Sequence, residues 1–96
     1  MEFVGYNWES LNRHDVTPEL VEEVLEGLMV SEFALDDYVD EKGESFSCEM
    51  RVGYTLGERL LEIGIRYLTV SSVFVFHAQS ASPTYKAKFE EQWNHG

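Results

Sequence analysis

The sequence has few of the residues that secreted and membrane-spanning proteins depend on. Its 96 residues include a single cysteine, Cys48, which excludes an intrachain disulfide. The longest apolar run, residues 70–76, contains two serines and is far shorter than the ~20 apolar residues of a membrane-spanning helix. The first residues have neither a basic segment nor an apolar core of signal-peptide length. We therefore expect a cytoplasmic protein without an export signal and without a membrane as partner.

Basic residues are also scarce. Seven Lys and Arg stand against 18 Asp and Glu, which gives a formal net charge of −11. Phosphate binding depends on Lys and Arg, so this balance disfavours a large nucleic-acid surface and disfavours RNA as a partner. Two readings stay open: the charge attracts a protein with a basic surface, or it only keeps an acidic face solvated.

What the sequence does contain is a folded core. The chain is 44% hydrophobic and 14% aromatic, which is too apolar for intrinsic disorder. Its length suits one domain over residues 1–96, with no repeat and no linker.

The clearest structural signal is the alternation of apolar with polar or glycine residues from Phe46 to Tyr54. This period of two predicts a half-buried strand in which Cys48, Met50 and Val52 face the core and the residues between them face outward. The polar turn Asp40–Gly43 precedes this strand.

Three further segments have strand patterns, at residues 32–39, 59–67 and 70–77. With residues 46–54 they are joined by short links, of which the last is expected at residues 68–69, and this arrangement predicts an antiparallel meander. The aromatic residues between positions 3 and 8 predict a short strand or an extended arm.

The predicted helices are marked by their first residues. Thr17 is a good N-cap before Pro18, and Gly27 stands where this helix should stop. Ser10 is expected to cap a short helix over residues 11–14, and Ser82 to cap a C-terminal helix that begins at Pro83. The apolar face of the helix after Thr17 contains Leu20, Val21, Val24, Leu25 and Leu28, and that of the C-terminal helix contains Tyr85, Phe89 and Trp93.

The expected fold is therefore α+β. We predict an antiparallel sheet of four to five strands, with two N-terminal helices and one C-terminal helix packed on one of its faces.

The sequence gives no signature for a metal or a cofactor. The acidic segment from Asp36 to Glu44 fails as a calcium loop, because Glu41 and Ser47 stand where that loop needs glycine and glutamate. The three histidines are scattered, and no second cysteine accompanies Cys48, so no zinc ligand set is predicted.

Acid–base chemistry with charge stabilisation is what the polar residues could supply. Metal-free RNA cleavage, in which the 2′-hydroxyl attacks its own phosphate, requires a general base and positioned cations. The candidates on the predicted sheet are Glu49 with Arg51, Glu62 with Arg66, and His77 beside Gln79. The alternative is that the Glu–Arg pairs are ion pairs on a solvated face. His14, likewise, is either a functional imidazole or a residue that caps a helix.

Several short motifs, taken in order, resemble the BrnT family of toxins, which are similar in fold to RelE. The resemblance extends over roughly residues 6–93. It rests on Trp8, Asn12, the Arg13-His14-x-Val16 segment, the helix over residues 17–25, Arg51-x-Gly53-x-Thr55-x-Gly57-x-Arg59 and Ala78-x-x-Ala81.

This resemblance implies a ribonuclease toxin of a type II toxin–antitoxin pair, neutralised by a small DNA-binding antitoxin. It carries His14, Arg51 and Arg59 over as matching positions, and we add His77 from its place on the last strand. The predicted site therefore has His14, Arg51, Arg59 and His77 as catalytic residues and Arg66 and Gln79 as substrate-binding residues, with no metal and no cofactor.

The sequence departs from the family at Gln79, which stands where these toxins have a candidate phosphate-binding arginine. Together with the net charge of −11, this predicts weakened, altered or lost ribonuclease activity. The rival interpretation is a non-enzymatic, acidic protein-interaction module on the same fold. A positive patch around Arg51, Arg59 and Arg66 would favour the enzyme, and its absence would favour the module.

Overall fold

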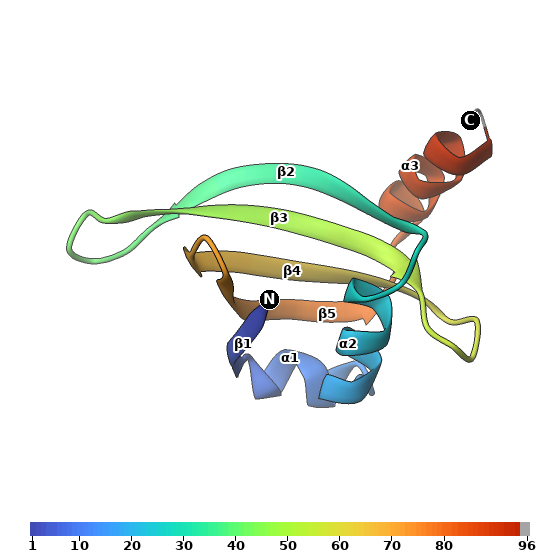
Figure 1. The fold of residues 1–96 in the computed structure, drawn as a ribbon, viewed down its shortest axis with the longest axis horizontal. Coiled ribbons are helices and arrows are strands. Elements are labelled where there is room, and N and C mark those ends of the chain that lie inside the picture. Colours follow the sequence, from blue (N-terminus) through green and yellow to red (C-terminus); the bar gives the residue numbers. More distant parts are fainter. Residues whose placement is uncertain (95–96) are drawn as a thin grey trace.

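The computed structural model describes residues 1–94 and has an α+β architecture built on a five-stranded sheet (Figure 1). The strand order is β1-β5-β4-β3-β2. The elements in chain order are β1 (Glu2–Tyr6), α1 (Trp8–Arg13), α2 (Pro18–Leu25), β2 (Val30–Val39), β3 (Ser45–Tyr54), β4 (Leu60–Thr69), β5 (Ser72–Ser80) and α3 (Pro83–Asn94).

Strands β2 to β5 form the predicted antiparallel meander, and each strand pairs with the next in sequence. The expectation of a purely antiparallel sheet is wrong, because β1 pairs parallel to β5 and makes the sheet mixed. A strand of five residues carries no sequence signal for the direction of its partner. Its direction is settled by the chain's passage into α1, where the N–H of Asn7 still donates to the carbonyl of Val75 at 2.8 Å.

The larger core lies between the sheet and the first two helices. We call this side of the sheet the α1/α2 face. Alternate residues of β4 and β5 point into it, as the period of two requires. The buried residues of this core are Leu11, Val16, Val21, Val24, Leu61, Ile63, Ile65, Val73, Val75 and Ala78.

The opposite side of the sheet, the α3 face, carries a second and smaller core. Phe89 of α3 packs there on Met50 and Val52 of β3. The expectation that all helices share one face is therefore wrong (Figure 1). Helices cover both sides of β3, with α3 on the side of Val52 and α2 on the other side. On the side away from Val52, Gly53 is so close to α2 that an added Cβ would lie 3.3 Å from Cγ1 of Val24.

The predicted inward direction of three β3 side chains is confirmed. Cys48, Met50 and Val52 are all buried, and they all project to the α3 face. Arg51 was expected to point outward into solvent. It projects to the opposite side of the sheet, the α1/α2 face, but it is only 8% exposed there, so the expectation of a solvent-exposed side chain is wrong.

Two predictions about the N-terminal helices also need correction. Helix α1 is capped by Asn7, whose Oδ1 accepts the N–H of Ser10, so Ser10 lies inside the helix. Helix α2 begins as predicted at Thr17 and Pro18 and ends at Leu25, with Gly27 directly after its C-cap Glu26, which confirms the predicted stop. Leu28 lies beyond that end and is 99% exposed, so it does not belong to the apolar face of the helix.

The links between strands follow the predicted chemistry in one case and shift in the other. Asp40 closes the β2–β3 hairpin, because its carboxylate accepts the N–H groups of Lys42 and Glu44 at 2.9 Å each. Gly43 adopts a φ of +85°, which favours glycine. The β4–β5 link lies at residues 70–71, slightly later than the expected residues 68–69.

A bulge in β5 determines which of its side chains share a face. Gly64 of β4 is opposite His77, whereas the next residue, Ile65, is opposite Val75, so Phe76 is the extra residue. A bulge places two consecutive side chains on one side of a sheet. An added Cβ on Gly64 would lie 2.7 Å from Cζ of Phe76 and 3.0 Å from Cβ of His77, so Phe76 and His77 both project to the α3 face.

Within residues 1–94, every helix is too short or too polar to cross a membrane.

Candidate functional site

Helix α1 takes the place of a strand along the outer edge of β5. Where β1 ends, Nδ2 of Asn7 donates to the carbonyl of Phe76 at 3.2 Å. One turn later, Oγ of Ser10 accepts the N–H of Ala78 at 3.2 Å. These bonds satisfy backbone groups of β5 that would otherwise lack a strand partner. They also fix α1, and His14 at its end, against the second half of β5.

A polar cleft of about 410 Å³ lies between α1 and β5 on the α3 face. The β5 bulge directs His77 into it. The polar side chains that line the cleft are Asn7, Glu9, Ser10, Arg13, His14, His77 and Gln79.

His77 is held by a buried carboxylate. Its Nε2 lies 2.8 Å from Oε2 of Glu62, whose side chain is 5% exposed. The other oxygen of Glu62 accepts the N–H of Ser82, at the start of α3, at 2.6 Å. An ionised carboxylate only accepts hydrogen bonds, so Nε2 of His77 carries a proton, and Nδ1 is left as the acceptor of a neutral ring.

His14 lies close to His77 across the cleft. It is the C-cap of α1, where its N–H donates to the carbonyl of Ser10 at 3.2 Å. The two imidazole centroids are 6.5 Å apart, with an angle of 58° between the ring planes. Two imidazoles, the side-chain group most often used in general acid–base catalysis, therefore line one cleft.

Arg59 contacts the backbone at the end of α1, where His14 and Asp15 lie. Its guanidinium donates to the carbonyl of His14 at 2.8 Å, to that of Asp15 at 2.7 Å and to Oγ of Ser80 at 3.2 Å. Asp15 has a φ of 55°, a left-handed conformation that few non-glycine residues adopt. Arg59 thus positions the turn that presents His14, and its donors are directed at these protein oxygens.

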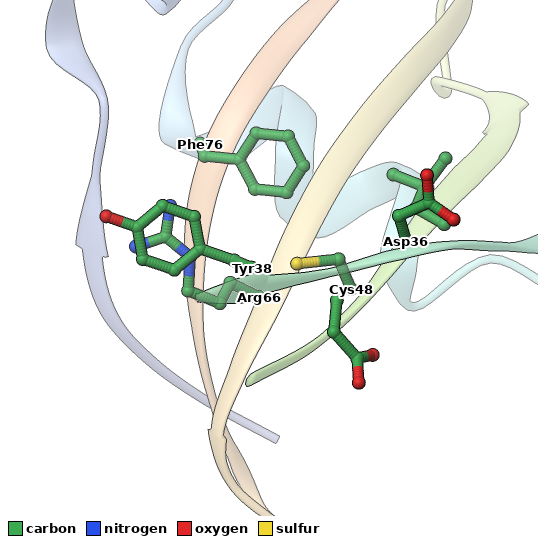
Figure 2. A pocket seen from close by; sticks show the side chains of 7 residues that line it. Asp36, Tyr38, Cys48, Arg66 and Phe76 are labelled. Atoms are coloured by element: carbon green, nitrogen blue, oxygen red, sulfur yellow. The ribbon is translucent and has the colours of Figure 1, made fainter. Parts of the chain in front are cut away.

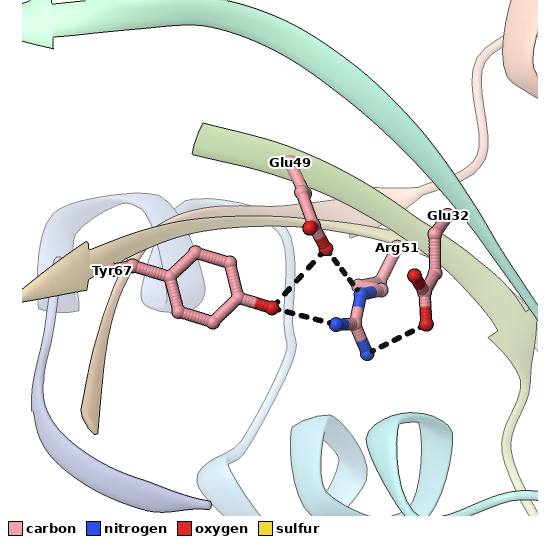
Figure 3. A network of polar contacts seen from close by, with 4 residues as sticks. All are labelled: Glu32, Glu49, Arg51 and Tyr67. Atoms are coloured by element: carbon pink, nitrogen blue, oxygen red, sulfur yellow. Dashed lines mark hydrogen bonds and ion pairs between the residues drawn. The ribbon is translucent and has the colours of Figure 1, made fainter. Parts of the chain in front are cut away.

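Arg51 is on the other side of the sheet, the α1/α2 face, where it belongs to a network of polar side chains (Figure 3). Its guanidinium contacts Glu49 at 2.8 Å, the hydroxyl of Tyr67 at 2.8 Å and Glu32 at 3.6 Å. The Tyr67 hydroxyl also donates to Glu49 at 3.3 Å. The expected Glu49–Arg51 pair is therefore present, but it is largely buried.

This network shifts the pKa of two of its members. Burial lowers the pKa of Arg51, but the hydrogen bond to Glu49 and the neighbouring negative charges raise it by more, so the net direction is upward. Burial raises the pKa of the Tyr67 hydroxyl, the charge of Glu49 raises it further, and Arg51 opposes both. Arg51 is thus a fixed cation, and Tyr67 is a neutral hydroxyl.

Arg66 projects to the α3 face but lies outside the cleft. Its Cζ is 3.7 Å from the centroid of the Tyr38 ring. The structure therefore brings His14, His77 and Gln79 together and places Arg59 behind them. It separates Arg51, on the α1/α2 face, from Arg66, on the α3 face, so the two do not form a positive patch with Arg59.

The features of the site that were not predicted include the partner of Glu62 and the position of Arg13. Glu62 shares a face with Arg66 as expected, but it pairs with His77, because the bulge at Phe76 shifts the alternation that sequence periodicity assumes. Arg13 lines the cleft and forms an exposed ion pair of 2.6 Å with Glu9, one helical turn earlier. The spacing of Glu9 and Arg13, four residues apart, was the available signal for this pair.

Among residues 1–94, no group of three or more His, Cys, Asp or Glu side chains is arranged to hold a metal ion. Comparison with known proteins gives no match for this chain, either to a protein-family model or to a curated protein.

Proposed function

We propose that this protein is a BrnT-like toxin of a type II toxin–antitoxin pair, with weak, metal-independent endoribonuclease activity in the cleft between α1 and β5. The observation that carries the proposal is the pair of imidazoles, His14 and His77, 6.5 Å apart, of which one is held by the buried carboxylate of Glu62. Its partner is a small antitoxin-type protein with a basic surface, which the net charge of −11 favours.

The cleft residues suggest a distribution of roles. Nδ1 of His77, left as an acceptor by the bond to Glu62, takes the proton from the 2′-hydroxyl of the RNA. The 2′-oxygen then forms a bond to phosphorus, and the bond from phosphorus to the 5′-oxygen breaks. His14 in its protonated form donates a proton to the leaving 5′-oxygen. The products are a 2′,3′-cyclic phosphate and a 5′-hydroxyl, and Glu62 keeps the imidazole of His77 oriented throughout.

Weak activity follows from the charges around this site. A positioned cation stabilises the charge that develops on the phosphate, and removing one typically costs about 10²–10³-fold in rate. Arg13 lines the cleft but is paired with Glu9, and Gln79 is neutral. The donors of Arg59 are directed at backbone carbonyls and Ser80. The imidazoles therefore act with little cationic support.

An RNA cleavage assay in the presence of a metal chelator tests this proposal. We expect slow cleavage of single-stranded RNA that is lost in His77→Ala and in His14→Ala and increased in Gln79→Arg. Lys42→Ala removes a cation at the tip of the β2–β3 hairpin and serves as the control, with an unchanged rate. Cleavage that survives His77→Ala in the folded protein would refute the proposed site.

A second candidate is the non-enzymatic interaction module, and one observation favours it. Arg51, Arg59 and Arg66 do not form a common positive patch, and Arg51 and Arg59 both bond to other groups of the protein. A surface for RNA phosphates would therefore have to form without these three side chains. In this reading, the acidic surface binds a basic protein and the cleft has no catalytic role.

Co-expression with the product of the neighbouring reading frame separates the two candidates. A toxin requires a partner whose binding suppresses RNA cleavage and relieves inhibition of growth. A module requires the same complex, with no cleavage and no growth inhibition by the free protein. Gln79→Arg adds a decisive comparison, because a gain of cleavage in this variant can only come from a site with the remaining catalytic groups in place.

A further inference from the structure

A hollow of about 350 Å³ opens on the α3 face next to the cleft (Figure 2). Helix α3 packs over Met50 and Val52 and does not extend over the part of the face where β4 contributes Arg66. The walls of the hollow are mainly apolar or aromatic, and its remaining lining is charged. The lining includes Asp36, Asp37, Tyr38, Cys48, Arg66 and Phe76.

Arg66 is the unusual member of this group, because its guanidinium forms no ion pair with any residue from 1 to 94. Its Cζ lies 3.7 Å from the ring centroid of Tyr38 and 5.4 Å from that of Phe74. Its Nε is buried and has no hydrogen-bond partner among residues 1–94. A buried donor without a partner is costly, and native proteins satisfy nearly all such groups. The guanidinium therefore keeps donor capacity that the protein does not use, at the lining of the hollow where a ligand can take it up.

The charges at the hollow limit what that ligand can be. Asp36 and Asp37 line it together with Arg66, yet neither carboxylate forms an ion pair with the guanidinium, and that of Asp37 accepts the hydroxyl of Ser45 at 3.2 Å. A phosphate placed here would be repelled by two carboxylates, whereas a neutral group would not. Aromatic and apolar walls favour a flat ring that stacks. A neutral, planar heterocycle fits this combination better than an anion does.

Phe76 connects the hollow to the cleft. Its side chain lines both, because the β5 bulge places it beside His77 on the α3 face. The glycine at position 64 makes room for its ring, since a Cβ there would lie 2.7 Å from Cζ of Phe76. A strand of RNA whose phosphate lies between the two imidazoles can therefore place an adjacent base over Phe76 and into the hollow.

We propose that this hollow is a nucleobase subsite that takes one unpaired guanine of the RNA strand. The inference rests on the proposed function in one respect only, the position of the RNA backbone in the cleft. The base stacks beside Tyr38 and Phe76, as bases do on aromatic side chains of other single-strand sites. Arg66 keeps its contact with Tyr38 and uses its free donors on the base.

Guanine is the base whose edges match the two ends of the hollow. Its O6 and N7 are adjacent acceptors, and arginine is the side chain that most often recognises this pair. Its N2 amino group is a donor, and the Asp36 carboxylate is an acceptor. Adenine presents a donor next to N7, so an arginine that reads O6 and N7 discriminates against it. A carboxylate and an arginine at one hollow therefore favour guanine.

A binding measurement on a cleavage-deficient background tests the subsite. In His77→Ala protein, fluorescence anisotropy compares a short labelled uridine oligonucleotide with one in which a single uridine is replaced by guanosine. We expect the guanosine to increase affinity about tenfold, the scale of one well-placed arginine–guanine contact. Arg66→Met, which keeps an apolar stem beside Tyr38, should abolish this preference. Lys42→Met removes the same charge at the tip of the β2–β3 hairpin, outside the lining of the hollow, and should preserve the preference.

The outcomes distinguish the subsite from the catalytic proposal. If the wild-type protein cleaves no RNA but shows a guanosine preference that Arg66→Met removes, the ribonuclease is refuted and the subsite is retained. If cleavage stops in His77→Ala but no variant shows a base preference, the ribonuclease is retained and the subsite is refuted. Tyr38→Leu provides a second variant if Arg66→Met fails to fold, and it too should remove the preference. Oligonucleotides that bind in none of these proteins, while a basic protein occupies this face, would overturn the subsite.

Discussion

The carboxylate of Glu62 contacts both Nε2 of His77, at 2.8 Å, and the backbone N–H of Ser82, at 2.6 Å. One buried side chain therefore joins β4, β5 and the first turn of α3. The same carboxylate orients the imidazole of His77 and holds the start of α3 against the sheet, so a test of the proposed catalysis at Glu62 has to measure stability as well.

The first prediction uses a substitution of similar shape. Glu62→Gln removes the charge and weakens two hydrogen bonds, and we expect it to lower the free energy of unfolding by about 1–3 kcal/mol, the range for disrupted bonds to a charged, buried group. Urea denaturation measures the change. Glu90→Gln, on the exposed side of α3, is the matched control and should leave stability within about 0.5 kcal/mol. Equal stabilities for both variants would contradict the structural role of Glu62.

The second prediction concerns Arg51 and separates stability from catalysis. Arg51→Met leaves Glu49 and the Tyr67 hydroxyl without their cation, and we expect the free energy of unfolding to fall by about 1.5–3 kcal/mol. Its RNA cleavage, corrected for the folded fraction, should be unchanged because the side chain lies on the face opposite the cleft. A folded Arg51→Met protein that has lost cleavage would place Arg51 in the active site after all.

The third prediction is a pH dependence that originates at Tyr67. Burial raises the pKa of its hydroxyl in the folded state above the ordinary 10.0. Between the unfolded and folded pKa values the unfolded chain binds fewer protons, so stability falls as the pH rises. The contribution is fully present below pH 10 and is lost as the pH rises through the folded pKa.

Tyr67→Phe should therefore reduce the slope of unfolding free energy against pH in this alkaline range. Tyr6 has a raised pKa for the same leading reason, burial, so part of the slope should remain. Urea denaturation at a series of pH values measures the slopes, and Tyr54→Phe, at an exposed position, provides the control. An unchanged slope in Tyr67→Phe would show that another group causes the alkaline destabilisation.

The fourth prediction tests the packing between the cleft and the hollow. Gly64→Ala places a methyl group 2.7 Å from Cζ of Phe76 and 3.0 Å from Cβ of His77, so both side chains have to move. We expect a loss of about 1–3 kcal/mol in stability, as for other overpacked sites, together with weaker RNA cleavage. Gly57→Ala is matched, because its added Cβ would meet nothing closer than 3.9 Å. A stable and active Gly64→Ala protein would show that Phe76 is not held in place.

The parts of the fold that could be predicted are those with a local physical cause. The order of elements follows from capping residues such as Thr17 and Ser82 and from turn chemistry at Asp40. The register of β3 follows from the alternation around Cys48, because a shift of one residue would move every apolar side chain of that face to the opposite face of the sheet. These features require no knowledge of what lies across the sheet.

The parts that could not be predicted depend on contacts between distant residues. Alternation assigns two faces to β3 but does not say that both are covered, so Arg51 was expected in solvent. The direction of β1 is decided by its partner β5, and its own five residues do not encode it. In the candidate site, the extra residue Phe76 brings His77 onto the face of Glu62, and no periodic pattern contains that insertion.

The pairing of β1 with β5 also determines how late in synthesis the sheet and the cleft beside it can assemble. Asn7 and Phe76 contact each other across 69 positions of the chain, so the first strand and the first helix emerge from the ribosome long before their partner exists. Such distant contacts form late, since the intervening chain has to be ordered first. Every nascent chain that stops before β5 therefore lacks the cleft, so the cleft can assemble only after most of the sequence has been synthesised.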